Sequence, residues 1–438
     1  MKYNLWQSLL WILAYIVLAL MPPLVALVGA TPSPRPFWIE LGVLAGFLNF
    51  GILGLQFVTT GRFQWFAAGF SLDNLLQFHR MTGIFALILI VAHPVILMMA
   101  DSRFLAFFDP SANFPRAAAL SLVVLAGAVL VATTLWRLSF QLAYEHWRIL
   151  HGLLAFTLLF LALGHVLMVD NYSEPFWKKG AFAVMAGFPL YLLVHSRFVR
   201  PWFMQKKPYR LVRIRAERND SWTLVLEPEG HGGLQFRPGQ FAWITLGDTP
   251  FSLQQHPFTI ASSAMQRPLE FTIKELGDFT ASIKRMRPWR RAWVEGPYGS
   301  FFHEVSQNKG AVFVAGGVGI TPIMSMLRTC CDCYGSTSCV LIYGNSDWDA
   351  VLFREEIEEI QSRLNLRVVH VLEDPPEGWK GEEGFIGEEV LKRHLPEDLN
   401  NYEYFICGPD PMMDACESVL RQRGIPPWKI FSERFDMV

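Results

Sequence analysis

Four histidines in two equally spaced pairs are the residues whose types and spacing most clearly favour chemistry. His79 and His93 lie 14 residues apart around an uncharged apolar run, and His151 and His165 repeat this spacing around another. Fourteen residues of α-helix rise about 21 Å through nearly four turns, so both members of a pair point to about the same side. Two such helices can clamp two stacked haems, each iron held by one histidine from each helix. The alternative is four packed or interfacial histidines.

The charged residues divide the chain into an apolar half and an ordinary one. Residues 1–200 contain 19 of the 77 Asp, Glu, Lys and Arg residues, and the other 58 lie in the remaining 238 positions. The first half therefore belongs in a membrane and the second in water. All six cysteines lie beyond position 329, which favours a reducing compartment for the second half. The net charge of −1 gives no indication of nucleic-acid binding.

Six apolar runs are long enough to cross a bilayer. They are predicted at 5–29, 38–60, 78–100, 117–136, 149–169 and 178–195. Basic residues gather on the even connections and after the last run, which places the C-terminal half in the cytoplasm. These basic residues are Arg62, Arg80, Arg137, Arg148, Arg197 and Arg200. We therefore expect a multi-pass protein of the cell (inner) membrane, with His79 and His151 nearer the cytoplasmic face.

From Lys206 onward the sequence consists of short segments in which apolar and polar residues alternate. Strands are predicted at 209–215, 222–227, 241–246 and 269–274, and they suggest a small antiparallel barrel that ends near His303. Beyond it, apolar strands at 311–315, 339–343, 366–372 and 404–407 alternate with helical stretches. This alternation of strands and helices is typical of a parallel sheet in an α/β domain.

Two glycine-containing segments follow strands of that sheet. The segment from Val314 to Pro322 has a G-G-x-G turn that opens a helix, where backbone N–H groups and the helix dipole can bind a pyrophosphate. A second segment, Cys407 to Met413, ends a later strand. Ligands of open α/β sheets bind beyond the carboxyl ends of strands, so both segments point to a dinucleotide site. A tight turn that binds no ligand is the alternative.

Two segments of the barrel have the residue types that a flavin needs. His256 to Ser263 joins an aromatic side chain to a run of hydroxyl groups, which suits a flat ring with a polar edge. Gly277 to Thr280, preceded by Lys274, offers backbone N–H groups, a hydroxyl and a cation for a pyrophosphate. Each segment taken singly is also compatible with an ordinary strand edge or turn.

Together these segments resemble the NADPH oxidase and ferric reductase family. His256–Ser263 is similar to the H-P-F-T-I-S-S flavin motif of that family, and the four histidines resemble its bis-histidine haem helices. Further segments fall in the family's order and resemble its motifs: 236–241, 295–299, 315–322 and 407–413. The resemblance covers nearly the whole chain.

The resemblance implies roles for individual residues around the haems and the flavin. His79 with His151 would ligate an inner b-type haem, and His93 with His165 an outer one. Phe258 would pack on the isoalloxazine, with Thr259 near its N5 edge. The remaining FAD-binding positions would be His256, Pro257, Lys274, Gly277 and Thr280.

The resemblance also implies a nicotinamide site. Cys407 would lie close to the nicotinamide, and Phe435 would shield the flavin until the nicotinamide displaces it. With Thr259, these two are the expected catalytic residues. NADPH or NADH would lie against Gly316, Gly317, Gly319, Thr321, Gly408 and Pro409.

Two departures from the family pattern concern specificity. After the second strand of the nucleotide domain, where relatives that prefer NADPH present an arginine, this chain has Asp347, and Arg354 follows in the next helix. The second departure is that no Arg lies within the outer half of the second predicted span, where oxidase relatives can hold one near the oxygen site. The only basic candidates near the outer haem propionates are then Arg35, Arg103 and Lys178.

The expected architecture has three parts. A six-helix transmembrane bis-haem domain (1–205) precedes an FAD-binding antiparallel β-barrel (206–306) and a Rossmann-like α/β NAD(P)-binding domain (307–438), which resembles ferredoxin–NADP reductase. The expected activity is electron transfer from cytoplasmic NAD(P)H through FAD and two b-type haems to dioxygen, which yields superoxide. Alternatives are a ferric-chelate reductase, an electron donor to a periplasmic protein or quinone, and a transporter or channel. No obligatory regulatory subunit is expected.

Overall fold

The computed structural model describes residues 5–29, 33, 35–63, 72–169, 171–302, 310–333 and 337–434. The chain forms two compact units. The helical unit consists of Asn4–Phe63 and Asn74–Arg200, and the C-terminal unit consists mainly of Pro201–Val438. The change between them falls where the sequence changes from scarce to frequent charges.

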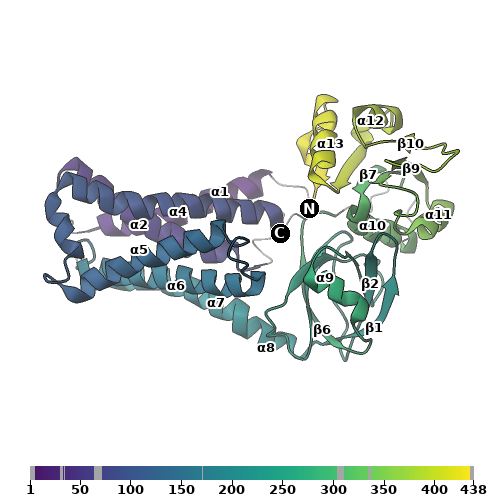
Figure 1. Ribbon diagram of the computed structural model, residues 1–438. Helices are drawn as coiled ribbons and strands as arrows, with labels where there is room; N and C mark the ends of the chain where they lie inside the picture. The colour runs from purple at the N-terminus through teal and green to yellow at the C-terminus, as the bar shows by residue number, and fades with distance from the viewer. Residues whose placement is uncertain are drawn as a thin grey trace. The chain divides into compact units, whose positions relative to one another are not determined.

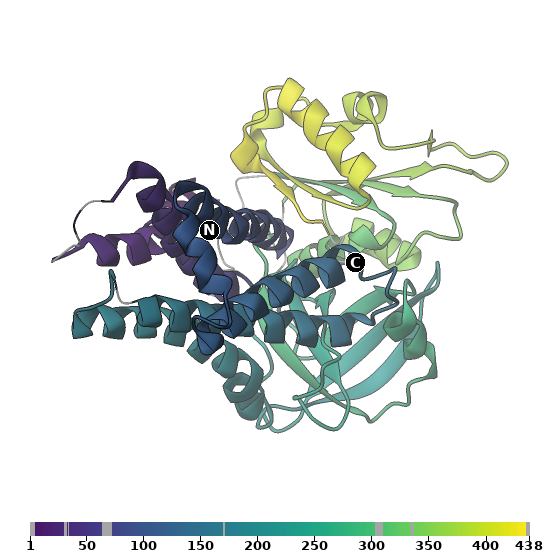
Figure 2. The same cartoon turned by 60° about the vertical axis from the view of Figure 1, so that its left-hand side comes forward.

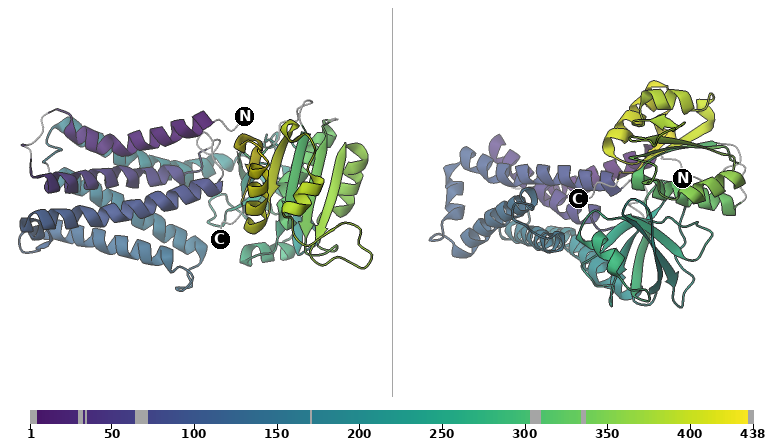
Figure 3. Two further views of the ribbon diagram at one scale, coloured as in Figure 1. Left: turned by 90° about the horizontal axis from the view of Figure 1, so that it is seen from above. Right: turned by 45° about the vertical axis from the view of Figure 1, so that its right-hand side comes forward.

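Long apolar helices make up the helical unit, and they lie side by side (Figures 1 and 3). Within the described residues, six helices are long and apolar enough to cross a membrane, which confirms the six predicted runs. Many of their large apolar side chains are exposed, as expected for a surface that faces lipid. The helices are α1 (Leu5–Leu27), α2 (Phe37–Thr59), α4 (Leu72–Ala100), α5 (Phe114–Leu135), α6 (Tyr144–Val169) and α7 (Phe176–Val194).

Shorter segments join and extend these helices. The 3₁₀ turn η1 (Ser102–Phe108) lies between α4 and α5. α5 then begins at a sequence suited to a helix start, because the Asn113 side chain accepts a hydrogen bond from the Arg116 amide and Pro115 lies in the first turn. After α7 the chain makes a π-helical turn (His195–Val199) and the short helix α8 (Arg200–Met204).

The first sheet of the C-terminal unit is antiparallel, with strand order β4-β3-β6-β1-β2-β5. Its inward positions are apolar and fully buried, as at Leu211, Leu224 and Phe271. The short helix α9 (Asp278–Ser282) follows β5. The strands are β1 (Tyr209–Ala216), β2 (Ser221–Pro228), β3 (Phe241–Leu246), β4 (His256–Thr259), β5 (Leu269–Lys274) and β6 (Arg291–Tyr298).

The second sheet has the order β10-β9-β8-β7-β11-β12, and its strand pairs are parallel. Helices cover both faces, as Figure 2 shows for α13 on one side. The strands are β7 (Gly310–Gly316), β8 (Cys339–Asn345), β9 (Leu366–Leu372), β10 (Glu382–Glu383), β11 (Tyr402–Cys407) and β12 (Ile430–Ser432). The helices are α10 (Ile320–Asp332), α11 (Arg354–Arg363), α12 (Glu388–His394) and α13 (Asp410–Gln422).

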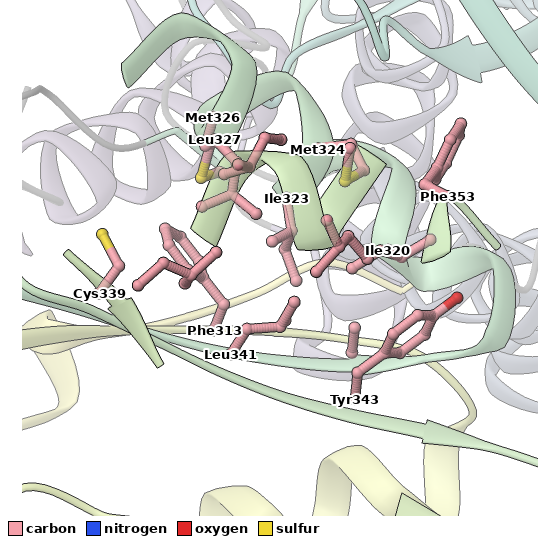
Figure 4. Packing of buried hydrophobic residues seen from close by; sticks show 14 of the residues in the cluster. Phe313, Ile320, Ile323, Met324, Met326, Leu327, Cys339, Leu341, Tyr343 and Phe353 are labelled. Carbon is pink, nitrogen blue, oxygen red and sulfur yellow. The ribbon is translucent and has the colours of Figure 1, made fainter. Parts of the chain in front are cut away.

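Helix α10 packs on one face of this sheet (Figure 4). Its side chains Ile320, Ile323 and Leu327 are fully buried against strand residues such as Phe313 and Leu341. Burial of large aliphatic side chains contributes roughly 1.5–3 kcal/mol each, so this contact fixes the helix that begins directly after the glycine turn.

All eight predicted strands are present, but others were not expected. β6 contains Gly296 and Pro297, and its first residue is charged, yet it pairs with both β3 and β1. β12 is only three residues long and forms an edge beside β11. Neither has the alternating or continuous apolar pattern by which a strand is predicted. His303 and the expected domain boundary at 306/307 lie outside the described residues.

Candidate functional site: histidine pairs, flavin sheet and nucleotide edge

The structure brings the four histidines together as two facing pairs. His79 on α4 faces His151 on α6, with 6.2 Å between ring centroids. His93 and His165, on the same two helices, have centroids 6.1 Å apart. A metal–imidazole bond is about 2 Å long, and the nitrogen lies roughly 1 Å from the ring centre. Two imidazoles on one metal therefore have centres about 6 Å apart, which both pairs match.

Hydrogen bonds to Nδ1 orient three of these rings. His93 Nδ1 lies 2.7 Å from the Gly42 carbonyl oxygen, so it must carry the proton and donate it. A side chain at Gly46 would clash with that ring, since a Cβ there would come within 2.8 Å of Nδ1. A histidine that donates from Nδ1 presents Nε2 as a free base, which is the form that ligates a metal.

The His79/His151 pair has a similar arrangement built from hydroxyl groups. Thr59 Oγ1 lies 3.2 Å from His79 Nδ1, and Thr134 Oγ1 lies 3.3 Å from His151 Nδ1. Both threonines also donate to backbone oxygens of their own helices, at 2.8 Å for Thr59 and 2.7 Å for Thr134. Each hydroxyl proton is therefore engaged, and its oxygen is available to accept from Nδ1.

Open backbone surrounds the histidines. Gly83 lies one turn after His79 on the same face of α4, and Gly127 lies two turns before Thr134 on the face of α5 that contacts His151. A Cβ at either glycine would meet no atom within 4 Å. Opposed imidazoles with this open space fit a flat prosthetic group held by two axial nitrogens. No cluster of three or more potential metal ligands occurs among the described residues.

Arg116 lies near the His93/His165 pair, and it was not among the basic residues named from the sequence. It lies at the start of α5 and interacts electrostatically with His165. Its guanidinium packs over the Phe107 ring, 4.2 Å from the centroid, and donates to the Ala106 carbonyl oxygen at 3.2 Å. Arg116 is therefore a further basic residue near His165, because the direction of α5 decides which cation reaches this end.

The three expected basic residues each have other contacts. Arg35 Nε lies 3.3 Å from Glu40, which also accepts a hydrogen bond from Tyr172 at 2.5 Å. Arg103 is exposed and pairs with Asp101 in its own turn. Lys178 is completely buried and donates to the Ala26 carbonyl oxygen at 2.8 Å.

The expected flavin residues lie on β4 and α9 of the first sheet. His256 stacks on Phe279 with 3.7 Å between ring centroids, and Phe258 lies parallel to Phe279 at 6.2 Å. Thr259 is buried and pairs with Phe241 across β3 and β4. Phe258 and Thr259 therefore occupy consecutive positions of β4, and their expected roles toward a flavin stay predictions.

The segment expected to bind the FAD phosphates forms a capped turn. Thr280 Oγ1 accepts hydrogen bonds from the amides of Leu276 and Gly277, each at 2.9 Å. The hydroxyl therefore stabilises the start of α9, so the turn itself is preorganised. Lys274, at the end of β5, is half-buried.

Both nucleotide segments meet at the carboxyl edge of the second sheet. β7 and β11 are neighbours, with Cys407 opposite Ala315. A Cβ on Gly319 would lie 2.3 Å from the Cys407 carbonyl oxygen, and a Cβ on Gly408 would lie 2.9 Å from the Gly316 amide nitrogen. Glycine is thus required at 319 and 408 for the strands and the turn to approach so closely.

Other expected residues of this edge lie in the same turn. Gly317 has a positive φ of 52°, which glycine adopts without strain. Thr321 is buried and donates to the Val318 carbonyl oxygen at 3.0 Å. Pro409 packs close to Gly316, since a Cβ on that glycine would lie 2.7 Å from its Cδ.

Cys407 has a buried acidic neighbour that the sequence did not indicate. Burial, together with the nearby Glu433 carboxylate, raises the pKa of the Cys407 thiol well above its ordinary value. Glu433 is 4% exposed, and its Oε2 has no hydrogen-bond partner within the described part of the chain. Burial raises the pKa of Glu433 to about 8. Only the tertiary structure could identify it, since the local sequence resembles any strand end.

Phe435, the expected shielding aromatic, lies outside the described residues. The described residue before it, Arg434, forms ion pairs with Asp410 at 2.5 Å and Asp414 at 2.6 Å. These contacts attach the C-terminal segment to the first turns of α13.

The turn after β8 contains the residues expected to affect nucleotide preference. Asp347 accepts a hydrogen bond from the Ala350 amide at 2.8 Å and from the Ser346 hydroxyl at 2.9 Å. Arg354 stacks on the Trp348 ring at 4.7 Å and donates to the Trp348 carbonyl oxygen at 3.2 Å. A carboxylate therefore lies at this edge, while the nearby guanidinium is held by local contacts.

Three family models match successive parts of the chain. Residues 45–162 match a ferric reductase-like transmembrane component, residues 223–301 an FAD-binding domain and residues 313–418 an oxidoreductase NAD-binding domain. The chain therefore has the NADPH oxidase/ferric reductase-like architecture. It carries the domain set of a transmembrane, flavin-dependent NAD(P)H oxidoreductase.

Two similar proteins each match more than a third of this chain. NADH-cytochrome b5 reductase 1 of Cryptococcus neoformans is 32% identical over 174 residues, which are 37% of this chain and 59% of that protein. A protein of the same name from Arabidopsis thaliana is 30% identical over 174 residues, which are 39% of this chain and 62% of that protein. The matches thus span about three fifths of these relatives.

Two solved structures are similar to part of the chain at lower sequence identity. The ferredoxin reductase in carbazole 1,9a-dioxygenase is 24% identical, with a TM-score of 0.46 over 52% of this chain and 69% of that chain. The cytochrome b5 reductase domain of Ulva prolifera nitrate reductase is 21% identical, with a TM-score of 0.46 over 53% of this chain and 97% of that chain.

Proposed function

We propose that this chain carries electrons across the cell (inner) membrane from NAD(P)H to dioxygen, through FAD and two b-type haems. His79 with His151 would hold one haem, and His93 with His165 the other. The observation that carries the proposal is the pair of matched imidazole separations, 6.2 and 6.1 Å, at two levels of the same two helices. Both separations match the distance of about 6 Å that two imidazoles on one metal require, and packed histidines without a shared ligand need not adopt it.

The residues of the nucleotide edge prepare the site for hydride transfer. When bound, FAD accepts two electrons together from a nicotinamide, and haem iron takes electrons singly. Gly319 and Gly408 keep the backbone open to the dinucleotide, and the buried Cys407 thiol stays neutral. Glu433, with its pKa near 8, holds a proton at neutral pH and so adds no charge beside Cys407.

The acceptor in this proposal is dioxygen on the outer face. One NAD(P)H and two dioxygen molecules give NAD(P)⁺, one proton and two superoxide ions, which balances both electrons. His93 and His165 would both ligate the iron of the outer haem, which would supply electrons to the acceptor without binding it. The basic residues on the even connections support a cytoplasmic C-terminal unit, where the nicotinamide pool is found.

A second candidate is the reduction of ferric chelates. The match of residues 45–162 to a ferric reductase-like transmembrane component favours it. The electrons would follow the same path, and only the acceptor at the outer face would differ, a ferric chelate in place of dioxygen.

The deciding experiment is the superoxide yield per NAD(P)H oxidised, in air, with purified haem- and FAD-loaded chain. A superoxide dismutase control separates superoxide from direct reduction of the probe. A yield near two per nicotinamide supports the oxidase. A low yield, with haem still reduced by nicotinamide and ferric chelate consumed without oxygen, supports the second candidate. Protein that contains no haem overturns both.

A further inference from the structure

A basic loop lies between α9 and β6 of the first sheet. The basic loop comprises residues 284–291 and ends at the first residue of β6, Arg291. Five of its eight residues are lysine or arginine, none is acidic, and its tryptophan, Trp289, is exposed. Loop residues Arg285, Arg287 and Arg290, with Met286, Pro288 and Trp289, line an open hollow of about 570 Å³ together with Ser282.

Neighbouring carboxylates neutralise only part of this charge. Lys284 pairs with Glu275 at 2.9 Å, and Arg291 lies 4.0 Å from Glu229. Glu229 is shared, since it also pairs with Arg210 on β1. Within the described residues, Arg285, Arg287 and Arg290 have no ion-pair partner, so three exposed guanidinium groups remain around the hollow.

The tryptophan of the loop is held outward at a conformational cost. Trp289 has a φ of 72°, in the left-handed region that favours glycine, and its side chain is 68% exposed. Its amide donates to the Leu211 carbonyl oxygen at 2.6 Å, and the Leu211 amide donates to the Arg290 carbonyl oxygen at 2.9 Å. A bulky residue in this region is strained, and such strain is found most often at functional positions.

We propose that this loop binds the anionic phospholipid headgroups of the membrane in which the six helices lie. Arginines bind phosphate oxygens through two parallel hydrogen bonds, and an exposed tryptophan is typical of protein surfaces at the membrane interface. Clusters of basic residues near a membrane span are typical of binding to anionic lipid.

The position of the loop in the chain supports this occupant over a soluble one. Its backbone partner, Leu211, follows the last residue of the sixth candidate span, Met204, by only seven residues. A domain tethered so closely to a bilayer meets lipid headgroups at a high effective concentration, so weak individual contacts are sufficient. The proposal does not depend on electron transfer or on the acceptor.

Hydrogen–deuterium exchange of the full chain in nanodiscs tests the proposal. Amides of residues 284–291 are compared in discs of neutral phosphatidylcholine and in discs that also contain phosphatidylglycerol. We expect slower exchange in the anionic discs and loss of the difference at high salt, because exposed charges are screened. Equal exchange in both discs overturns the proposal. Equal slowing by inorganic phosphate in neutral discs also overturns it, and identifies a soluble anion site instead.

Variants separate the loop from the net charge of the protein. The triple variant R285E/R287E/R290E should remove the difference between the discs. The control R363E/R421E/R423E makes the same change in charge at exposed positions of the NAD-binding domain and should keep the difference. Trp289→Gly suits the observed φ, keeps all charges and should reduce the protection partially. An unchanged difference in the loop variant contradicts the proposal.

Discussion

The guanidinium of Arg328 on α10 forms a two-point ion pair with Glu356 on α11, with contacts of 2.6 and 2.7 Å. The same group donates to the Ala261 carbonyl oxygen at 2.7 Å, at the end of the flavin motif on the first sheet. One largely buried side chain therefore joins the helix after the nucleotide turn to the flavin sheet. Nearby, Ser325 Oγ donates to the Ser262 carbonyl oxygen at 2.8 Å and reinforces this contact.

Replacement of Arg328 by Met should destabilise the C-terminal unit by roughly 3 kcal/mol, because it leaves Glu356 and a backbone oxygen without their partner. Denaturant unfolding of the full chain, followed by FAD fluorescence, measures this change. Arg363→Gln is the control, since its pair with Glu359 spans 4.0 Å on the surface and should contribute little. The double variant R328M/E356L should recover part of the loss. If Arg328→Met were as stable as the parent, Arg328 would not be the residue that joins α10 to the flavin sheet.

Glu433 should make the stability of the C-terminal unit depend on pH. Its folded pKa of about 8 lies above the ordinary 4.5, so the folded state keeps a proton that the unfolded chain has released between these values. Stability contributed by the neutral carboxyl is therefore lost as pH rises from about 4.5 to 8, by on the order of 5 kcal/mol.

Glu433→Gln removes this titration, so the stability of the variant should change little with pH. The stability difference in favour of the variant over the parent should therefore be largest near pH 8. The temperature of FAD release, measured across pH 5–8, is the readout. Glu358→Gln, at an exposed position of α11, should follow the parent. Parallel curves for parent and Glu433→Gln would show that the buried carboxyl is not the responsible group.

Replacement of His79 or His151 by Ala should remove the haem proposed for that pair, because a single axial nitrogen remains. Haem per chain, measured as the pyridine complex, should fall from about two to about one in either variant. His146→Ala, at an exposed position of α6, is the matched control and should keep the full content. Hydride transfer to FAD should continue in all three. If haem per chain is unchanged in both the His79 and the His151 variant, these two histidines do not hold a haem.

Gly319→Ala should impair nucleotide binding without loss of FAD. The added Cβ would lie 2.3 Å from the Cys407 carbonyl oxygen, so the turn or the end of β11 must move. A displacement of this size should lower kcat/KM for NAD(P)H on the order of tenfold to hundredfold. Gly232→Ala adds the same atom where no atom lies within 4 Å and should behave as the parent. Normal kinetics in Gly319→Ala would mean that the dinucleotide binds elsewhere.

Asp347 should make the chain prefer NADH to NADPH, because a carboxylate repels a 2′-phosphate at the edge after β8. Asp347→Ser keeps an acceptor for the Ala350 amide but removes the charge. The NADPH/NADH ratio of kcat/KM should then rise roughly tenfold, which corresponds to about 1.4 kcal/mol. Asp349→Ser, two residues along and exposed, is the control. An unchanged ratio would place the phosphate away from Asp347.

Much of the fold could be predicted because its signals are local. Six long apolar runs predicted the membrane helices, and the predicted strands alternate or run continuously in apolar residues, as at Phe241–Leu246 and Leu366–Leu372. The equal spacing of the histidines also fixed which residues could face one another. Strands such as β6 were not predicted, because their pairing depends on neighbours rather than on their own residues.

The sequence by itself determined the order of the three domains, the four histidines and the glycine segments, since backbone freedom, charge and periodicity can be read from residue type and spacing. Only the tertiary structure decided which side chains complete them. Glu433 beside Cys407 and Arg116 beside His165 are brought there by segments far apart in the chain. A carboxyl group or guanidinium acquires its environment from packing, and packing is a property of the folded chain.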